Sequence, residues 1–83
     1  MKEYLLTITK SLTYGFDLNK QNSVFEAKDD DAAKNITYRM REKQHQSIVA
    51  ETTIRYVLYH HDKSILNISV SRGEDGVVRY EGW

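Results

Sequence analysis

The stretch that decides the fold is Asp29–Ser47, DDDAAKNITYRMREKQHQS, which has helical spacing in a chain otherwise made of alternating residues. Its three aspartates can cap a helix, because their side chains accept hydrogen bonds from the free backbone amides of the first turn. Their charge also complements the positive end of the helix dipole. We therefore expect one helix from about Asp30 to about Ser47.

The predicted helix has a narrow apolar stripe. Ala33, Ile36 and Met40 follow one another near helical spacing, and Thr37 and Gln44 dilute the stripe with polar groups. Such a stripe is typical of a helix that packs on one side and faces water on the other.

The residues before the helix indicate two strands. Residues 3–14 alternate between two faces. One face carries Tyr4, Leu6, Ile8, Leu12 and Tyr14, with Lys10 as the exception, and the other carries Leu5, Thr7, Thr9, Ser11 and Thr13. Gly15 then begins a polar stretch that continues through Asn22, which we expect to be a rather long loop. Ser23–Ala27 is predicted to be a short second strand, paired with the first as a hairpin.

The residues after the helix indicate three more strands. Thr53–His60 and Ile65–Arg72 alternate clearly, and a turn is expected at 61–64. Gly73–Gly76 is a strong hairpin loop, and Val77–Trp83 is the last predicted strand. The fold class is therefore α+β in a single domain, 1–83, with a four- or five-stranded antiparallel sheet of order β-β-α-β-β-β and one helix packed on one face.

This arrangement predicts two unlike sheet faces. The helix-facing side should carry Leu6, Ile8, Ile54, Leu58, Leu66, Ile68 and Val70. The opposite face should be polar and open to solvent, with Thr7, Thr9, Ser11, Thr13, Arg55, Tyr59, Asn67, Ser69 and Arg79.

The composition indicates the cellular location of the protein and the class of partner it binds. The chain has 83 residues, with 12 basic and 12 acidic side chains and no cysteine. A zero net charge argues against a strong nucleic-acid binder. The absence of disulfides, of a signal peptide and of a membrane-spanning segment leads us to expect a cytoplasmic protein that does not enter a membrane.

No motif in the sequence predicts a catalytic, cofactor or metal site. His60 and His61 are adjacent in a predicted strand, so they should point to opposite faces and fail to share an ion. The aspartates at 29–31 are explained as helix caps, and no nucleophile elbow occurs. We expect no enzyme activity.

Aromatic and basic residues suggest a binding surface instead. Six tyrosines and one tryptophan are many for this length, and both types are favoured at interfaces. We expect Tyr4, Tyr14 and Tyr56 at the edge of the core and Tyr38, Tyr59 and Tyr80 at the surface. The candidate partner-binding residues are Arg55 and Tyr59 on the open face, with Tyr38, Arg39, Arg41 and Lys43 on the helix.

The outline of the first half resembles small phage and mobile-element proteins of the anti-CRISPR type. The shared features are a strand from Tyr4, a polar loop, the short strand at 24–27 and a helix opened by Asp29–Ala33. The resemblance implies a non-enzymatic inhibitor that occupies a surface on a host nucleic-acid-handling complex. It carries no specific functional residue with it.

Three interpretations remain open. The first is a module that binds a protein partner by surface occlusion. The second is a weak binder of single-stranded nucleic acid or RNA through the same Arg, Tyr and Thr face. The third is a self-associating structural protein, in which an edge strand such as Val77–Trp83 pairs with its copy in a homodimer.

Overall fold

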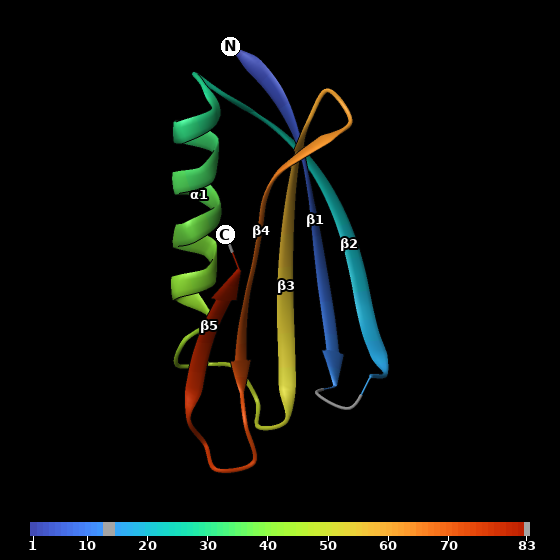
Figure 1. Ribbon diagram of the computed structural model, residues 1–83, viewed down its shortest axis with the longest axis vertical. Coiled ribbons are helices and arrows are strands. Elements are labelled where there is room, and N and C mark those ends of the chain that lie inside the picture. The colour runs from blue at the N-terminus through green and yellow to red at the C-terminus, as the bar shows by residue number, and fades with distance from the viewer. Residues whose placement is uncertain (13–14, 83) are drawn as a thin grey trace.

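The computed structural model describes residues 1–12 and 15–82 of the chain. It shows an α+β fold, with a five-stranded antiparallel sheet and one helix, in the predicted β-β-α-β-β-β order (Figure 1). The elements are β1 (Lys2–Leu12), β2 (Asp17–Ala27), α1 (Asp30–Lys43), β3 (Thr52–His60), β4 (Lys63–Arg72) and β5 (Val78–Gly82). Thr13, Tyr14 and Trp83, which the predicted first and last strands included, lie outside the described residues.

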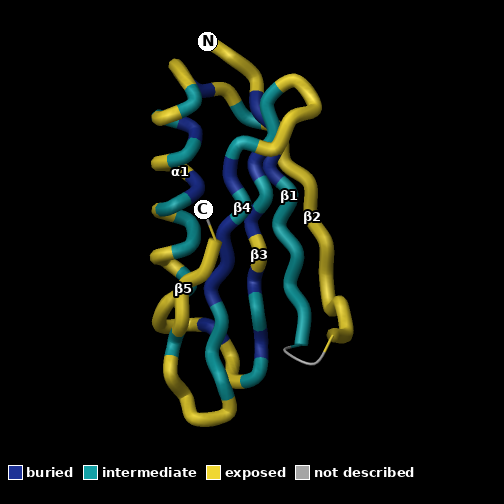
Figure 2. The backbone as a smooth tube through the Cα atoms, viewed as in Figure 1, coloured by how far each residue is buried: buried dark blue, intermediate teal, exposed yellow. Residues whose placement is uncertain are grey.

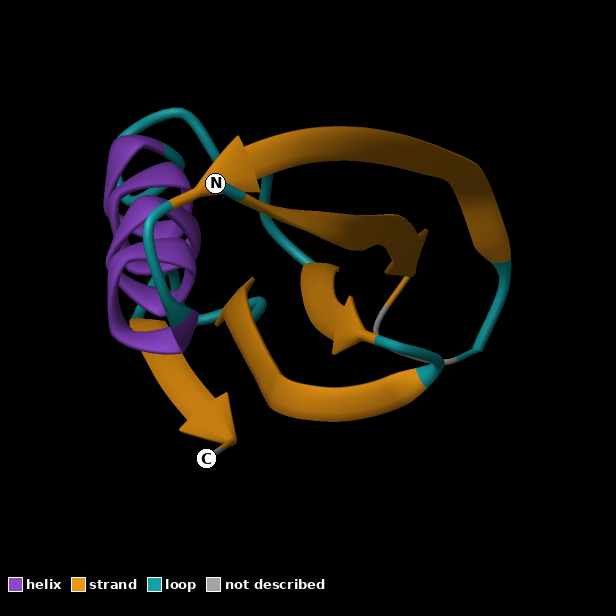
Figure 3. Cartoon of the chain, turned by 90° about the horizontal axis from the view of Figure 1, so that it is seen from above, coloured by secondary structure: helices purple, strands orange, loops and turns teal. Residues whose placement is uncertain are grey.

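The strands do not lie in chain order. The sheet order is β2-β1-β3-β4-β5, so β1 lies between β2 and β3, while β2 and β5 form the two edges. The helix connects the edge strand β2 to β3. Seen from above, the strands bend round in an arc and the helix occupies one side of it (Figure 3). The molecule is elongated, with extents of 41 × 20 × 18 Å.

The start of α1 matches the capping prediction. Asp29 is the N-cap, and its side chain accepts a 2.8 Å hydrogen bond from the backbone amide of Ala32. The regular helix ends at Lys43, earlier than expected, and turns continue from Gln44 to Ser47. The backbone amide of Gln44 still bonds to the carbonyl of Arg41, which closes the last turn.

The core lies between α1 and the sheet face beneath it (Figure 2). The helix contributes two small residues, Ala33 and Thr37, both fully buried. Small side chains let the helix approach the sheet closely, and the Thr37 hydroxyl donates to the carbonyl of Ala33, so its burial leaves no donor unpaired. The buried apolar residues are Tyr4, Leu6, Ala27, Ala33, Ile48, Ile54, Tyr56, Leu58, Leu66, Ile68 and Val70.

The prediction that Ile36 belongs to the buried stripe of the helix was wrong. Its side chain is 37% exposed, and Thr37, which we expected to dilute the stripe, takes the buried position. The helix is therefore rotated so that Ala33 and Thr37 face the sheet, while Ile36 lies on the flank of the buried face. The predicted sheet-side core residues are confirmed as buried, with Ile8 partly buried.

The prediction of a long polar loop before a short second strand was also wrong. Most of that polar stretch belongs to β2, which pairs with β1 from Ala27 opposite Lys2 to Asp17 opposite Ser11. The ladder of backbone hydrogen bonds needs no apolar side chains. At a sheet edge the polar side chains stay in water, and every residue from Asp17 to Val24 is exposed.

The connection between β3 and β4 is tighter than the four-residue turn expected. His61 and Asp62 form a two-residue turn in which both have positive φ, 51° and 62°. This geometry matches the right-handed twist of the flanking strands. It also changes where the second histidine points.

Candidate protein-binding surface

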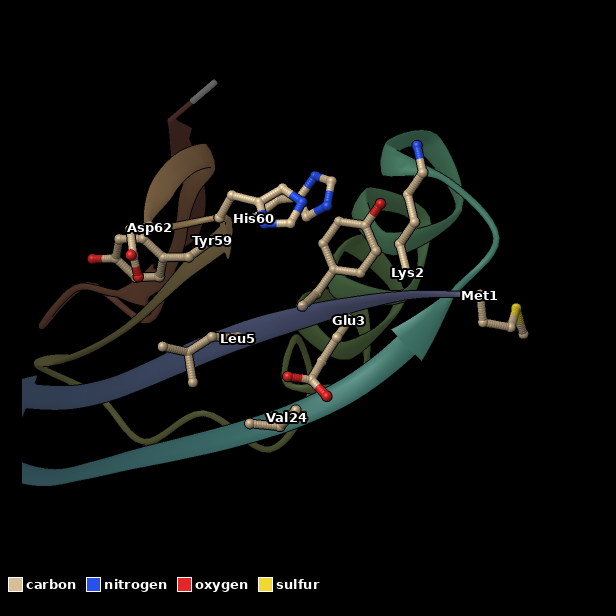
Figure 4. A pocket seen from close by; sticks show the side chains of 10 residues that line it. Met1, Lys2, Glu3, Leu5, Val24, Tyr59, His60 and Asp62 are labelled. Atoms are coloured by element: carbon tan, nitrogen blue, oxygen red, sulfur yellow. The ribbon is translucent and has the colours of Figure 1, made fainter.

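A row of apolar side chains crosses three strands on the face of the sheet away from the helix, called here the open face. Leu5 of β1 lies in register between Val24 of β2 and Tyr59 of β3. Val24 is 61% exposed and Leu5 is 38% exposed, while Tyr59 is partly buried. Figure 4 shows the three on adjoining strands beside the N-terminus. This apolar row was not predicted as a site.

Arg55 lies in the polar part of the open face. Its side chain is exposed, and Nη1 donates a 2.8 Å hydrogen bond to Oδ1 of Asn67 on β4. Thr9 lies beside it on β1, in register. The arginine is therefore held over the sheet by one partner while its other N–H groups remain available.

Ser69 departs from the predicted open face. It was expected in solvent, yet it is only 4% exposed. In register it lies between Arg55 of β3 and Glu81 of β5, and these longer side chains stand on either side of it. Asn67 and Tyr59 do lie on this face but are partly buried.

The predicted helix candidates belong to a different part of the molecule. The guanidinium of Arg41 lies 4.4 Å from the ring centre of Tyr80 and 5.4 Å from that of Tyr38. Its Nη1 donates to the carbonyl of Glu81 at 3.4 Å. Tyr80 in turn bonds to Nδ1 of His45 at 2.9 Å. This cluster joins the end of α1 to β5, so these side chains are engaged in contacts within the protein.

The six predicted partner-binding residues therefore fall into two groups on opposite sides of the sheet. Arg55 and Tyr59 share the open face with the apolar row. Tyr38 is partly buried against the core, contrary to the expected surface position, and Arg41 is engaged as described above. Arg39 and Lys43 are exposed on the helix. A single flat partner surface cannot contact both groups.

A cluster of polar and aromatic groups lies where the helix begins. The Tyr4 hydroxyl donates a 2.7 Å hydrogen bond to Oδ1 of Asp30, and Nδ1 of His60 lies 3.2 Å from the same oxygen. Burial and the neighbouring Asp30 carboxylate raise the pKa of Tyr4 to about 12. The Tyr4 hydrogen bond, aided by nearby positive charge, lowers the pKa of Asp30.

These pKa shifts leave Tyr4 protonated and Asp30 charged at neutral pH. The cluster therefore acts as a structural clamp and not as an acid–base site. A tyrosine with a raised pKa keeps its proton, and a carboxyl with a lowered pKa keeps its charge. The cluster ties α1 to β1 and β3.

The expected separation of the two histidines was wrong. The rings of His60 and His61 stack with centres 4.2 Å apart, because the left-handed backbone at His61 turns its side chain back along the strand. Within residues 1–12 and 15–82, no group of three or more histidine, cysteine, aspartate or glutamate side chains is arranged to hold a metal ion.

Two hollows flank the sheet. The larger, about 840 Å³, lies at the N-terminal end and is lined by Tyr4, Leu5, Val24, Tyr59 and His60, among others. The second, about 500 Å³, lies beside the end of the helix. Both are partly open to solvent.

The chain matches no family model, no curated protein and no solved structure. In the part of the chain that the structure describes, no helix has the length and apolar character needed to span a membrane.

Sequence reasoning missed Leu5 and Val24 as members of the surface. A signal existed for Leu5, because the alternation in 3–14 placed it on the same face as Thr7 and Thr9. It is a large apolar residue on an otherwise polar face. Alternation along Ser23–Ala27 places Val24 on the face opposite Phe25 and Ala27. Its position beside Leu5 comes from the register of β2.

Proposed function

We propose that this protein is a small non-enzymatic module that binds a protein partner through its open face and acts by covering the partner's surface. The supporting observation is the exposed apolar row of Val24, Leu5 and Tyr59 on a face without a covering helix. A contiguous apolar patch with a polar surround is typical of interaction sites.

Arg55 is the second element of this proposal. Tyrosine and arginine are the residue types most often found among energetically dominant interface positions. Arg55 and Tyr59 lie on the same face of β3, four residues apart, and the Asn67 hydrogen bond already restrains the arginine. A partner carboxylate or carbonyl would meet a partly oriented donor, which reduces the entropy lost on binding.

A narrower form of the proposal concerns the partner. The strand–strand–helix–strands outline resembles anti-CRISPR proteins, which supports a bacterial nucleic-acid-handling complex as the target. The protein would then be a cytoplasmic inhibitor of phage or mobile-element origin.

Capture from a bacterial lysate tests the proposal. Tagged protein is used as bait with and without nuclease, in parallel with an Arg55→Ala/Tyr59→Ala variant and an Arg39→Ala/Lys43→Ala control on the helix. The proposal expects a protein that survives nuclease, is lost with the open-face variant and is kept by the control. Recovery that disappears with nuclease would favour nucleic acid, whose phosphate contacts also make binding fall steeply with salt.

A further inference from the structure

The two edges of the sheet are not equally protected. At β5 the strand is short, and the helix reaches over it: Arg41 donates to the main-chain carbonyl of Glu81, and its guanidinium stacks on Tyr80. Covering an edge with a helix and its side chains is a common way to prevent pairing with another chain. The β5 edge, Val78–Gly82, is therefore a poorer site for self-association than the β2 edge.

Among the described residues, no helix side chain donates a hydrogen bond to the β2 edge. It runs for 11 residues without proline, and its side chains from Asp17 to Val24 are exposed. In Figure 1 it lies on the side of the sheet away from the helix. Within the described residues, β1 is the one strand that pairs with it, so its outer row of N–H and C=O groups faces outward. Its register with β1 shifts between Asn19 and Asp17, and the regular segment 19–27 is left as a template for another strand.

Among the described residues, the charged side chains of Glu26 and Lys20 on β2 lack an ion-pair partner. Glu26 lies directly opposite Glu3 of β1, and both carboxylates are exposed. Like charges directly opposite one another in a sheet are destabilising. Neither carboxylate forms an ion pair with any residue of 1–12 or 15–82, and neither does Lys20, which lies on the same face of β2. An added cation beside Glu26 would relieve this repulsion.

We propose that β2 pairs antiparallel with β2 of a second copy of this chain, about a two-fold axis through Ser23. Ser23 is midway between Lys20 and Glu26, so this register places Lys20 opposite Glu26 of the second copy, and the reverse. Two cross-strand charge pairs form, each beside a Glu3. No like charges face one another across the paired segment 19–27.

The same register extends the exposed apolar row. Val24 would lie opposite Asn22 of the second copy and diagonal to its Val24. The row of Tyr59, Leu5 and Val24 would then continue into the same row of the second copy. The two sheets would join into one, with both helices on one side and a single open face on the other.

Exchanging the charges at Lys20 and Glu26 tests whether the β2 edge pairs with a second copy and in which register. Sedimentation velocity across a concentration series is run on the parent, on Lys20→Glu, on Glu26→Lys and on the Lys20→Glu/Glu26→Lys double variant. Lys63→Glu, an exposed lysine at the start of β4, controls for the change in net charge. Circular dichroism and thermal unfolding establish that each variant is folded.

We expect a concentration-dependent dimer whose dissociation constant rises by about tenfold or more in each single β2 variant, because two attractive pairs become repulsive. The double variant should recover the parent value, and Lys63→Glu should leave it unchanged. A parent that stays monomeric at high concentration would overturn the proposal. So would a folded double variant that dimerises no better than the single variants.

The proposed function does not depend on this dimer. A folded Lys20→Glu monomer retains Arg55 and Tyr59 and should still capture the partner protein. Failure of dimerisation and failure of partner binding are therefore separate results.

Discussion

The hydroxyl of Tyr4 donates a 2.7 Å hydrogen bond to the carboxylate of Asp30, joining the start of β1 to the first turn of the helix. Tyr4 is 1% exposed, so its hydroxyl needs a partner, and Asp30 supplies one at the helix end where negative charge is favourable. The bond fixes where the helix begins over the sheet. Two pH-dependent predictions follow from it.

The first prediction concerns acid. The pKa of Asp30 in the folded protein lies below its ordinary value of 3.8, so the unfolded chain binds the proton more readily. Its contribution to stability is present above about pH 4 and is lost as the pH falls through the folded pKa. Asp30→Asn should therefore be less stable than the parent at pH 7, and the difference should shrink below pH 4. Urea unfolding at pH 3 to 7 measures this, and a difference constant with pH would contradict it.

The second prediction concerns alkali. The folded pKa of Tyr4 is raised from 10.0 to about 12, so the folded protein holds this proton more tightly than the unfolded chain. The corresponding stability is complete below pH 10 and is lost as the pH rises toward 12. In an ultraviolet titration, the parent-minus-Tyr4→Phe difference should show one tyrosine ionising well above pH 10. Ionisation of that tyrosine near pH 10 while circular dichroism still shows a folded protein would refute the clamp.

The third prediction concerns Gly82. A side chain there would meet the carbonyl oxygen of Asn67 and the Cα of Ile68, both main-chain atoms that cannot move aside, and the residue has a φ of +105°. Gly82→Ala should loosen β5 from β4. We expect the loss in the free energy of unfolding to exceed the cost of backbone strain alone, about 1–3 kcal/mol, because the close approach adds to the strain. Gly76→Ala is the matched control: its φ is +78°, but nothing lies within 4 Å of the added carbon. Equal losses in both variants would mean that the close approach at Gly82 has no effect.

The fourth prediction concerns the helix stripe. Leu58 is fully buried, and Leu58→Ala should cost about 2–5 kcal/mol in the free energy of unfolding because it leaves a cavity. Ile36 is partly exposed on the helix, and Ile36→Ala should cost well under half as much. Denaturant unfolding of both variants checks the rotation of the helix. A loss at Ile36 as large as that at Leu58 would place Ile36 in the core after all.

The strands of the core could be predicted because their apolar residues alternate without ambiguity. Ile54, Tyr56 and Leu58 on β3 have one face to bury, and shifting the register by one residue would expose all of them. A cap from one of the three aspartates at 29–31 was also predicted, and Asp29 provides it. These features depend on local pattern, which the sequence contains directly.

Other features depend on contacts between distant residues. Most of β2 is polar, and only its pairing with β1 makes it a strand. Thr37 takes the buried position ahead of Ile36 because the small Ala33–Thr37 face fits closer to the sheet and the hydroxyl finds a carbonyl within its own helix. Hydrophobicity alone ranks those two residues the other way.

The residues of the candidate site also divide into those that a local pattern places and those that depend on contacts between distant residues. Arg55 and Tyr59 could be placed on the open face by alternation. The contacts of Arg41 could not be recognised, since Tyr80 and Glu81 lie about forty residues later on another element, and the packing of Tyr38 depends on how the helix lies against the core. The apolar row needed the register of three strands, which no local pattern supplies.

The central claim is that the open face binds a protein partner, and one measurement tests it most directly. The protein captured in a nuclease-resistant manner is purified, and its affinity is measured by calorimetry for the parent, for Arg55→Ala/Tyr59→Ala and for Arg39→Ala/Lys43→Ala. We predict that the open-face variant binds at least about thirtyfold more weakly, as expected for two interface anchors of about 1 kcal/mol or more each. The helix variant should bind like the parent. Unchanged affinity of a folded open-face variant, or a loss confined to the helix variant, would contradict the account.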